Sequence, residues 1–577
     1  MEHHTLDNWS KDFRPDGLLY FTQRIEEMLT PSTDHIFKMP VLNTALLVDE
    51  YLENAKLVRE GIIDPIHLEH IMEEFRASFE DDIVLKKNLK EQDKRSVLQK
   101  IESKEDNYEN VLGYVKLLLR DYQVWCKEML LDYVPQDNKK KEIEQLIRCY
   151  IPGLISSGYS SEFVCRYNTK IFNTEPVNSF DSLNAFLNRF DFKKRKYAVY
   201  IAIDANVIKF RKVLEKRLSV DFEPFKDNID IPYDKEKYIL SRIQITDLDE
   251  QSAAKKAYKH LNTFFTYYRL LGEQEENWYF NDVRVVDEKK QISKAVLKTS
   301  GLNRSNNQNT EVLASYADYY IISLQSNARK AYQQINRAID LHNIAIDDID
   351  IKNRFLNFWS TLEILFVSDK NMPTINEIIY KMVPILQKDY LDYLFYWFNT
   401  EILKLKEQLG LDSLAEQIEE DKNDILWPIY IAALNKYSAQ RDELYLFLKD
   451  YPLLRNRLFQ LNEMCHNKAR LAKIVNEHGE RVSWHIKRLY RTRNAIVHSG
   501  ICPNNLQELT DHLHGYADQC LNELIILLSR KRQLESISNA LIDVQFRTEE
   551  IMATLHDQSP INKDELLSIL YFWSQFS

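Results

Sequence analysis

The stretch RVSWHIKRLYRTRNAIVHSG, residues 481–500, predicts a helix that is both amphipathic and dense in cations. Its apolar side chains recur every three or four residues and share one face, which we expect to pack on a core: Ile486, Leu489, Tyr490, Ile496 and Val497. Arg493 falls on that same face, where an unpaired guanidinium is costly to bury. Gly500, with Pro503 just beyond it, is expected to end the helix.

A second predicted helix carries a carboxylate on its apolar face. In NRFLNFWSTLEILF (353–366), Phe355, Trp359 and Glu363 are spaced by four residues and share that face. Burying Glu363 or Arg493 alone is expensive, whereas a hydrogen-bonded pair offsets much of the desolvation. We therefore expect the two helices to pack and Glu363 to meet Arg493. An ion pair that only holds a helical bundle together fits this spacing equally well.

The composition predicts a helix-rich chain. The 577 residues include only 11 glycines and 15 prolines, against 32 tyrosines and 27 phenylalanines. A hydrophobic fraction of 44% excludes wholesale disorder, and a formal net charge of −11 argues against a protein that coats DNA. A nucleic-acid ligand would have to bind a local basic patch.

The sequence also indicates the compartment. The six cysteines are scattered without a Cys-x-x-Cys spacing, which is typical of a reducing environment and supplies no zinc framework. The first residues lack the apolar core of a signal peptide, and the longest apolar runs are too short to span a bilayer. We expect a cytoplasmic protein without a membrane partner.

The order of patterns predicts a mainly α fold in three parts. Residues 1–155 are expected to form a helical N-terminal region, and 156–300 a small α+β domain. The polar stretch 301–310 is the predicted linker to an all-helical C-terminal domain, 311–577. The middle part contains short β-rich runs and one clear helix: strands at 163–167, 198–203, 241–246 and 282–286, and a helix at 253–271.

Helical periodicity continues through the C-terminal part. The predicted helical segments are about 311–344, 350–368, 373–409, 425–448, 453–475, 480–499, 504–532 and 535–557. A subset of these helices is expected to form a bundle.

Two histidine spacings outside the 481–500 helix are assigned no function. His67 and His70 lie three residues apart and are expected to be exposed on a helix, because the sequence offers too few further ligands for a metal. Arg337 and His342 repeat the gap between Arg493 and His498, but in an ordinary helical segment, and we interpret that repeat as chance.

The two decisive motifs together resemble the HEPN superfamily, and within it the ApeA-like HEPN domains. F-x-x-x-W-S-T-L-E-I-L at 355–365 is followed by L-Y-R-T-R-N-A-I-V-H-S-G at 489–500. The resemblance covers roughly 320–535, and it depends on the combination of both motifs in this order. It implies a HEPN bundle in the C-terminal part.

The resemblance implies a metal-independent endoribonuclease with no cofactor, in which two protomers of a homodimer bring their Arg/His motifs together in one composite site. The ribose 2′-hydroxyl of the RNA attacks the adjacent phosphate. By position, His498 would be the general acid or base, and Arg493 would bind the scissile phosphate. Asn494 would orient the imidazole or bond the phosphate, and Glu363 would fix Arg493.

The cations of the same helix are the predicted RNA contacts. Lys487, Arg488 and Arg491 make this the most basic regular stretch of an acidic chain, which indicates a focused anion site. A solvated cationic face explains Lys487 and Arg488 equally well.

The chain departs from the family pattern at one position. Some relatives carry a tyrosine two residues after the histidine as a target of nucleotide transfer, and here that position is Gly500. The resemblance further implies a toxin or antiviral effector that cleaves tRNA or other RNA in abortive infection, with a phage-derived trigger or inhibitor. Residues 1–300 would then be the sensor or restraint.

Two other classes of protein are open from the sequence. The first is a HEPN-fold protein that binds nucleic acid or nucleotides without cutting. The second is a helical scaffold in which Glu363–Arg493 is structural and His498 is an ordinary histidine at a helix end.

Overall fold

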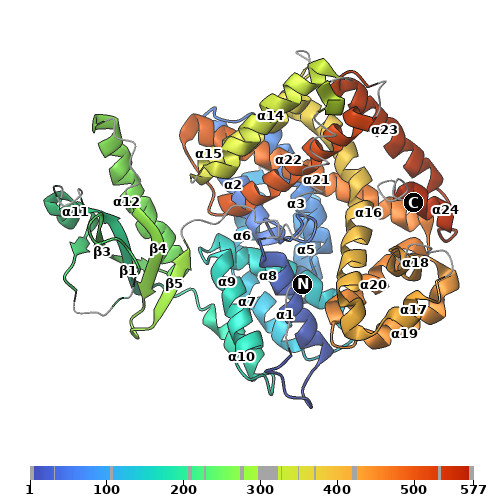
Figure 1. Ribbon diagram of the computed structural model, residues 1–577, viewed down its shortest axis with the longest axis horizontal. Coiled ribbons are helices and arrows are strands. Elements are labelled where there is room, and N and C mark those ends of the chain that lie inside the picture. The colour runs from blue at the N-terminus through green and yellow to red at the C-terminus, as the bar shows by residue number, and fades with distance from the viewer. Residues whose placement is uncertain are drawn as a thin grey trace. The chain divides into compact units, whose positions relative to one another are not determined.

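The computed structural model confirms a mainly α chain with a small α+β part in the middle (Figure 1). It describes residues 6–31, 33–103, 108–205, 209, 211–225, 229, 231–272, 279–296, 322–325, 328–348, 350–368, 372–418, 425–530 and 534–570. The predicted linker at 301–310 lies outside these residues. Within the described ranges, no helix combines the length and the apolarity needed to cross a membrane.

Contacts between residues divide the chain into two compact units. One unit groups residues 1–28 and 33–152 with 305–577, and the other contains 29–32 and 153–304. The N-terminal helices thus pack with the C-terminal helices, although more than 150 residues of sequence separate them. The three-part division predicted from the sequence stays a prediction.

The first unit begins with a series of amphipathic helices. Their bounds are α1 Asp16–Leu29, α2 Thr44–Arg59, α3 Ile66–Asp81, α4 Ile83–Asn88, α5 Glu91–Ser103, α6 Tyr108–Leu118, α7 Tyr122–Tyr133 and α8 Lys140–Ser156. α2 shows why these segments are helical: Asn43 caps its first turn, and Leu47, Val48, Tyr51 and Ala55 form its buried face. α2 packs against α3, and α3 in turn packs against a long C-terminal helix.

The C-terminal part of this unit is helical wherever it is described. Its elements are α14 Arg329–Asp347, α15 Ile351–Phe366, α16 Thr374–Leu409, α17 Asp412–Ala415, α18 Trp427–Ala433, the 3-10 helix η3 Asn435–Tyr437, α19 Ser438–Phe447, α20 Pro452–Cys465, α21 Lys468–Ser499, α22 Leu506–Arg530, α23 Ile537–Thr554 and α24 Lys563–Ile569. α15 lies against α14, α21 and α22, and α16 lies along α21.

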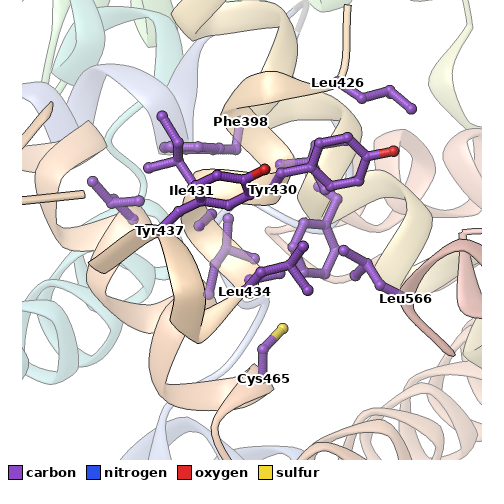
Figure 2. Close-up of a cluster of buried hydrophobic side chains, with 14 of the residues drawn as sticks. Phe398, Leu426, Tyr430, Ile431, Leu434, Tyr437, Cys465 and Leu566 are labelled. Atoms are coloured by element: carbon purple, nitrogen blue, oxygen red, sulfur yellow. The ribbon is translucent and has the colours of Figure 1, made fainter. Parts of the chain in front are cut away.

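A large apolar core joins several of these helices away from residues 481–500 (Figure 2). It takes Phe398 from α16, Tyr430 and Ile431 from α18, Cys465 from α20 and Leu566 from α24. Close packing of so many large side chains gives this part of the bundle a rigid framework.

The second unit contains an antiparallel sheet. Its elements are α9 Ser161–Thr169, the π-helix η1 Lys170–Thr174, α10 Asp181–Arg189, β1 Arg195–Asp204, α11 Arg211–Leu218, β2 Val220–Phe222, β3 Tyr238–Asp247, α12 Glu250–Gly272, β4 Tyr279–Val286 and β5 Ile292–Val296. The strand order is β2-β3-β1-β4-β5, with Ala198 opposite Gln244 on β3 and Val286 on β4. α12 covers the face that bears Val199 and Ile201 (Figure 1). The predictions of three strands and of the 253–271 helix are confirmed.

The predicted strand at 163–167 is wrong, because these residues belong to α9. The Ser160 side chain accepts the Phe163 N–H as an N-cap, and the Asp249 carboxylate accepts from the backbone N–H of Ser160. Phe163 and Val164 are buried by this helix. Residues 163–167 are too few for their β-propensity to determine the structure. The N-cap and the tertiary contacts make this segment helical instead.

Two predicted helix boundaries in the C-terminal part are also wrong. Segment 425–448 is interrupted at Leu434, where the backbone is extended between α18 and η3. The break expected between 475 and 480 lies instead at Asn467, whose side chain caps α21. Gly479 is inside α21, where a Cβ would stand 2.3 Å from the Gln387 side chain, so this glycine leaves room for that side chain of α16.

Candidate functional site

α21 brings the predicted functional residues to its C-terminal end. The helix extends without a break from Lys468 to Ser499 and ends at Gly500, as predicted. Gly500 has a φ of 70°, a left-handed conformation that favours glycine, and its N–H donates to the Ile496 carbonyl. Lys352 at the start of α15 donates from Nζ to the Gly500 carbonyl at 3.5 Å. The last turn of α21 is therefore linked to α15.

Arg493 and Glu363 meet, as predicted from their helical faces. Arg493 Nη2 lies 3.8 Å from Glu363 Oε1, and Trp359 Nε1 donates to the same carboxylate oxygen at 2.7 Å. Packing of Trp359 on Tyr490, with ring centroids 5.6 Å apart, joins the two helices beside the pair. The expected burial of Arg493 is wrong: both charged side chains are 29% exposed. The pair is a loose contact at the protein surface.

Asn494 and His498 complete the predicted set, but only Asn494 contacts Arg493. Arg493 Nη1 donates to Asn494 Oδ1 at 3.2 Å, and Asn494 is almost fully buried. His498 lies one turn later on the exposed end of the helix. Among the described residues, no hydrogen bond or ion pair joins His498 to Arg493 or Glu363. The arrangement thus offers a cationic group and a separate imidazole, both open to a ligand.

The predicted RNA contacts Lys487, Arg488 and Arg491 precede Arg493 on the same helix but lie in a different environment. Arg488 Nε donates to Glu50 Oε1 at 3.1 Å and Arg488 Nη2 pairs with Glu74, while Arg491 Nη2 donates to Glu50 Oε1 at 2.9 Å. The side chains of Arg488 and Arg491 are only 6% and 3% exposed. Lys487 Nζ lies 3.7 Å from Glu73. The carboxylates come from α2 and α3, so the N-terminal helices cover these cations.

Electrostatic interactions satisfy Glu50 better than they satisfy Arg491. Burial alone would raise the pKa of the Glu50 carboxyl, but Arg488 and Arg491 outweigh it and hold that pKa below its usual value. Arg491 is less well satisfied, because its Nε and Nη1 are buried with no hydrogen-bond partner among the described residues. Removing an arginine from this cluster would leave buried carboxylates without compensation.

His67, which we expected to be exposed beside His70, is buried. Its ring packs on Tyr490 with centroids 5.6 Å apart, and His70 is half-buried beside it. Burial, followed by the charge of Arg491, lowers the pKa of His67 to about 4. α3 therefore presents a neutral imidazole to α21.

The sequence does not reveal Glu50 and Glu74, the carboxylates that form ion pairs with the buried arginines. Both belong to ordinary amphipathic helices, and Glu50 is 438 residues from Arg488 along the chain. No local pattern in the sequence links positions so far apart.

Comparison with known proteins finds no matching family model, no matching curated protein and no matching solved structure. A functional assignment therefore rests on the geometry at the end of α21 and on the sequence motifs at 355–365 and 489–500.

Proposed function

We propose that this chain is a metal-independent endoribonuclease of the HEPN class that acts as a cytoplasmic homodimer. The observation that carries the proposal is the grouping of Arg493, Asn494 and Glu363 beside His498 at one exposed helix end. A guanidinium and an imidazole are the two groups that cleavage of RNA through its own 2′-hydroxyl needs.

The Arg493–Glu363 pair is better suited to ligand binding than to holding the fold. Half-exposed ion pairs contribute about 0–1 kcal/mol to stability, so this contact is a weak reason to place an arginine here. At 3.8 Å, Glu363 orients the guanidinium without saturating its donors. The planar fork of Arg493 would then bind two oxygens of a phosphate.

The proposed reaction is transesterification. A base removes the proton of the ribose 2′-hydroxyl, and the 2′-oxygen attacks the adjacent phosphorus. The bond from phosphorus to the 5′-oxygen breaks, and an acid protonates that oxygen. His498 of each protomer would supply the base or the acid, since an imidazole transfers protons near neutral pH. Arg493 would stabilise the charge on the phosphorane. The products are a 2′,3′-cyclic phosphate and a 5′-hydroxyl.

Exposed apolar groups next to His498 support a dimer with a composite site. Val497 is 48% exposed and Ile501 is 50% exposed, on either side of the last helical turn. A second copy packing here would cover both and would bring a second Arg493 and His498 to the same phosphate. Apolar side chains flanked by polar groups are typical of such contacts.

RNA contact by Lys487, Arg488 and Arg491 stays a prediction, and it requires that α2 and α3 first move away from these cations. Glu50 and Glu74 occupy Arg488, and Glu50 also occupies Arg491, so RNA phosphates would have to displace α2 and α3. This observation supports the proposal that the N-terminal helices restrain the nuclease. A toxin or antiviral role, a phage-derived trigger and tRNA as substrate rest on the family resemblance alone.

Product chemistry tests the proposal. The purified full chain is incubated with total tRNA in EDTA, and the new ends are analysed. We expect 2′,3′-cyclic phosphate and 5′-hydroxyl ends, and Arg493→Ala should reduce their yield at least about 100-fold, a typical loss for a group acting on the transition state. Products with 3′-hydroxyl ends, or cleavage only with added divalent metal, would contradict it.

Expression in cells covers the case in which the purified reaction lacks a host component or the right RNA substrate. Induction of the wild-type chain should arrest growth with the same RNA ends, and induction of Arg493→Ala at equal abundance should not. Equal arrest by both chains would exclude this site as the cause.

A further inference from the structure

Two histidines and one aspartate converge at the contact between α14 and α22. His342 Nε2 lies 2.7 Å from Asp518 Oδ1, and His514 Nε2 lies 3.3 Å from the same oxygen. His514 and Asp518 are one turn apart on α22, whereas His342 comes from α14. Among the described residues, this is the one group of three or more His, Cys, Asp or Glu side chains whose ligand atoms all lie within 4.8 Å of one another.

The dimensions of the group match a metal site. In a tetrahedral zinc site with bonds of about 2 Å, ligand atoms are about 3.3 Å apart. The separations of 2.7 Å and 3.3 Å bracket that spacing, so small side-chain shifts would admit an ion. Both imidazoles already direct Nε2 toward one point from two helices.

Aromatic packing surrounds the two imidazoles of the group and holds them in place. His342 and His514 are buried, and their rings stack with centroids 5.0 Å apart. Phe358 of α15 packs on both rings, with centroid distances of 5.2 Å and 4.7 Å. An aromatic wall that packs on both imidazoles limits their rotation and supports an ordered ligand geometry.

The donor set indicates which ions fit. Two imidazole nitrogens and one carboxylate oxygen suit divalent first-row transition metals such as Zn²⁺, while Mg²⁺ and Ca²⁺ prefer an all-oxygen set. Three protein ligands leave a coordination position for water.

We propose that His342, His514 and Asp518 bind a divalent transition-metal ion, with Zn²⁺ as the reference ion, and that this ion fastens α14 to α22. Binding replaces the His342–Asp518 hydrogen bond and the close His514–Asp518 contact with three metal bonds, and it releases any proton held by the imidazoles. The ion stands against Phe358, five residues before Glu363 on α15, so it supports the helix that carries the carboxylate beside Arg493. This inference does not depend on ribonuclease activity.

Metal titration of the full-length chain tests the proposal. The chain is stripped with EDTA, dialysed and titrated with Co²⁺, whose visible absorption reports the coordination geometry, and Zn²⁺ is then added as a competitor. We expect one tightly bound ion per chain, and a melting temperature that rises with zinc concentration because the ion binds the folded state. Absence of any site at micromolar zinc would overturn the proposal.

Two variants and one matched control assign the ligands. Asp518→Asn and His514→Gln keep hydrogen-bonding groups in place and should weaken zinc binding at least about 100-fold, which is the upper range for loss of an outer-shell partner. His70→Gln removes a histidine next to another histidine on α3 and should leave the affinity unchanged. Unchanged affinity in folded Asp518→Asn or His514→Gln would contradict the assignment.

X-ray absorption on the wild-type zinc complex keeps the test decisive if a variant fails to fold. The expected first shell contains nitrogen and oxygen only, with the outer-shell pattern of two imidazoles. A first shell containing sulfur, or lacking imidazole, would place the ion elsewhere and overturn the proposal.

Discussion

Three arginines on the same helix fall into two opposite environments. Arg488 and Arg491 are buried and held by Glu50 and Glu74, whereas Arg493, less than one turn further on, is 29% exposed and meets Glu363 at 3.8 Å. Counting cations along residues 481–500 treats these arginines as equivalent. Their partners show that they are not.

The difference teaches that charge density in a sequence does not locate a ligand site. An arginine whose carboxylates come from the same chain mainly stabilises that chain, while one with a single loose partner retains donors for a ligand. The first part of α21 therefore belongs to the interface with α2 and α3. The last two turns of α21 are the functional candidate.

The largest expected effect comes from Arg488→Ala. This change leaves Glu50 and Glu74 buried with Arg491 as the remaining cation, and breaking a buried ion pair from one side costs about 3–5 kcal/mol. Denaturant unfolding measures the loss, and the double variant Arg488→Met, Glu74→Gln, which keeps Glu50 as the partner of Arg491, should recover part of it. A loss similar to that of a surface arginine such as Arg76→Ala would remove the distinction drawn here.

Acid should destabilise the folded chain, because α21 and α22 each carry a histidine whose pKa is lowered in the folded state. Burial, helped by Arg481, lowers the pKa of His478 to about 3, and burial with Lys38 lowers the pKa of His512 to about 3. Unfolded histidines titrate near 6.5, so the unfolded chain binds more protons and stability falls as the pH drops from 6.5 toward 3. Each histidine should account for about 2 kcal/mol between pH 7 and pH 5.

Replacement of His478 by phenylalanine checks that origin. His478 stacks on Tyr390 with ring centroids 3.9 Å apart, so Phe can keep the contact without titrating. The fall in unfolding free energy between pH 7 and pH 5 should become smaller by about 2 kcal/mol. An equal pH dependence in His478→Phe and wild type would exclude His478 as a source.

A smaller effect is expected at the loose pair. Glu363→Gln should change the unfolding free energy by less than about 1 kcal/mol, because a half-exposed ion pair is largely solvated. Denaturant unfolding beside Arg488→Ala gives the contrast directly. A loss of several kcal/mol in Glu363→Gln would instead favour the helical scaffold, in which the pair holds the bundle together.

Lys487→Ala should have the smallest effect. Its Nζ lies 3.7 Å from Glu73, whose side chain is largely solvent-exposed, so stability should change by less than about 0.5 kcal/mol. As long as α2 and α3 cover this part of α21, RNA affinity, measured by filter binding over a range of salt concentrations, should also be unchanged. A salt slope reduced by about one would show that Lys487 contacts a phosphate after all.

Local patterns in the sequence were enough for the part of the site that lies on two helices. Four-residue spacing placed Glu363 and Arg493 on facing surfaces, and Gly500 marked the end of α21 correctly. Periodicity identifies the apolar face of a helix, but it does not reveal whether another element covers the flank of that face. For this reason the burial of Arg488 and the exposure of Arg493 were both unpredictable from spacing.

Distant contacts account for the other failures. The break expected between 475 and 480 does not occur, and Gly479 in that gap leaves room for the Gln387 side chain of α16. The spacing of His342 to Arg337 carries no information about its contacts, because His514 and Asp518 lie on another helix. The one available signal was the i, i+4 spacing of His514 and Asp518 on a predicted helix.

The most direct test of the central claim is the rate of RNA cleavage by His498→Ala, measured in EDTA at equal concentrations of folded protein. His498 is exposed on the last turn of α21, so its replacement should leave the unfolding midpoint unchanged. We predict a rate at least about 100-fold below wild type, as for loss of a general acid or base. Cleavage by His498→Ala at the wild-type rate would contradict the assignment of the end of α21 as the catalytic site.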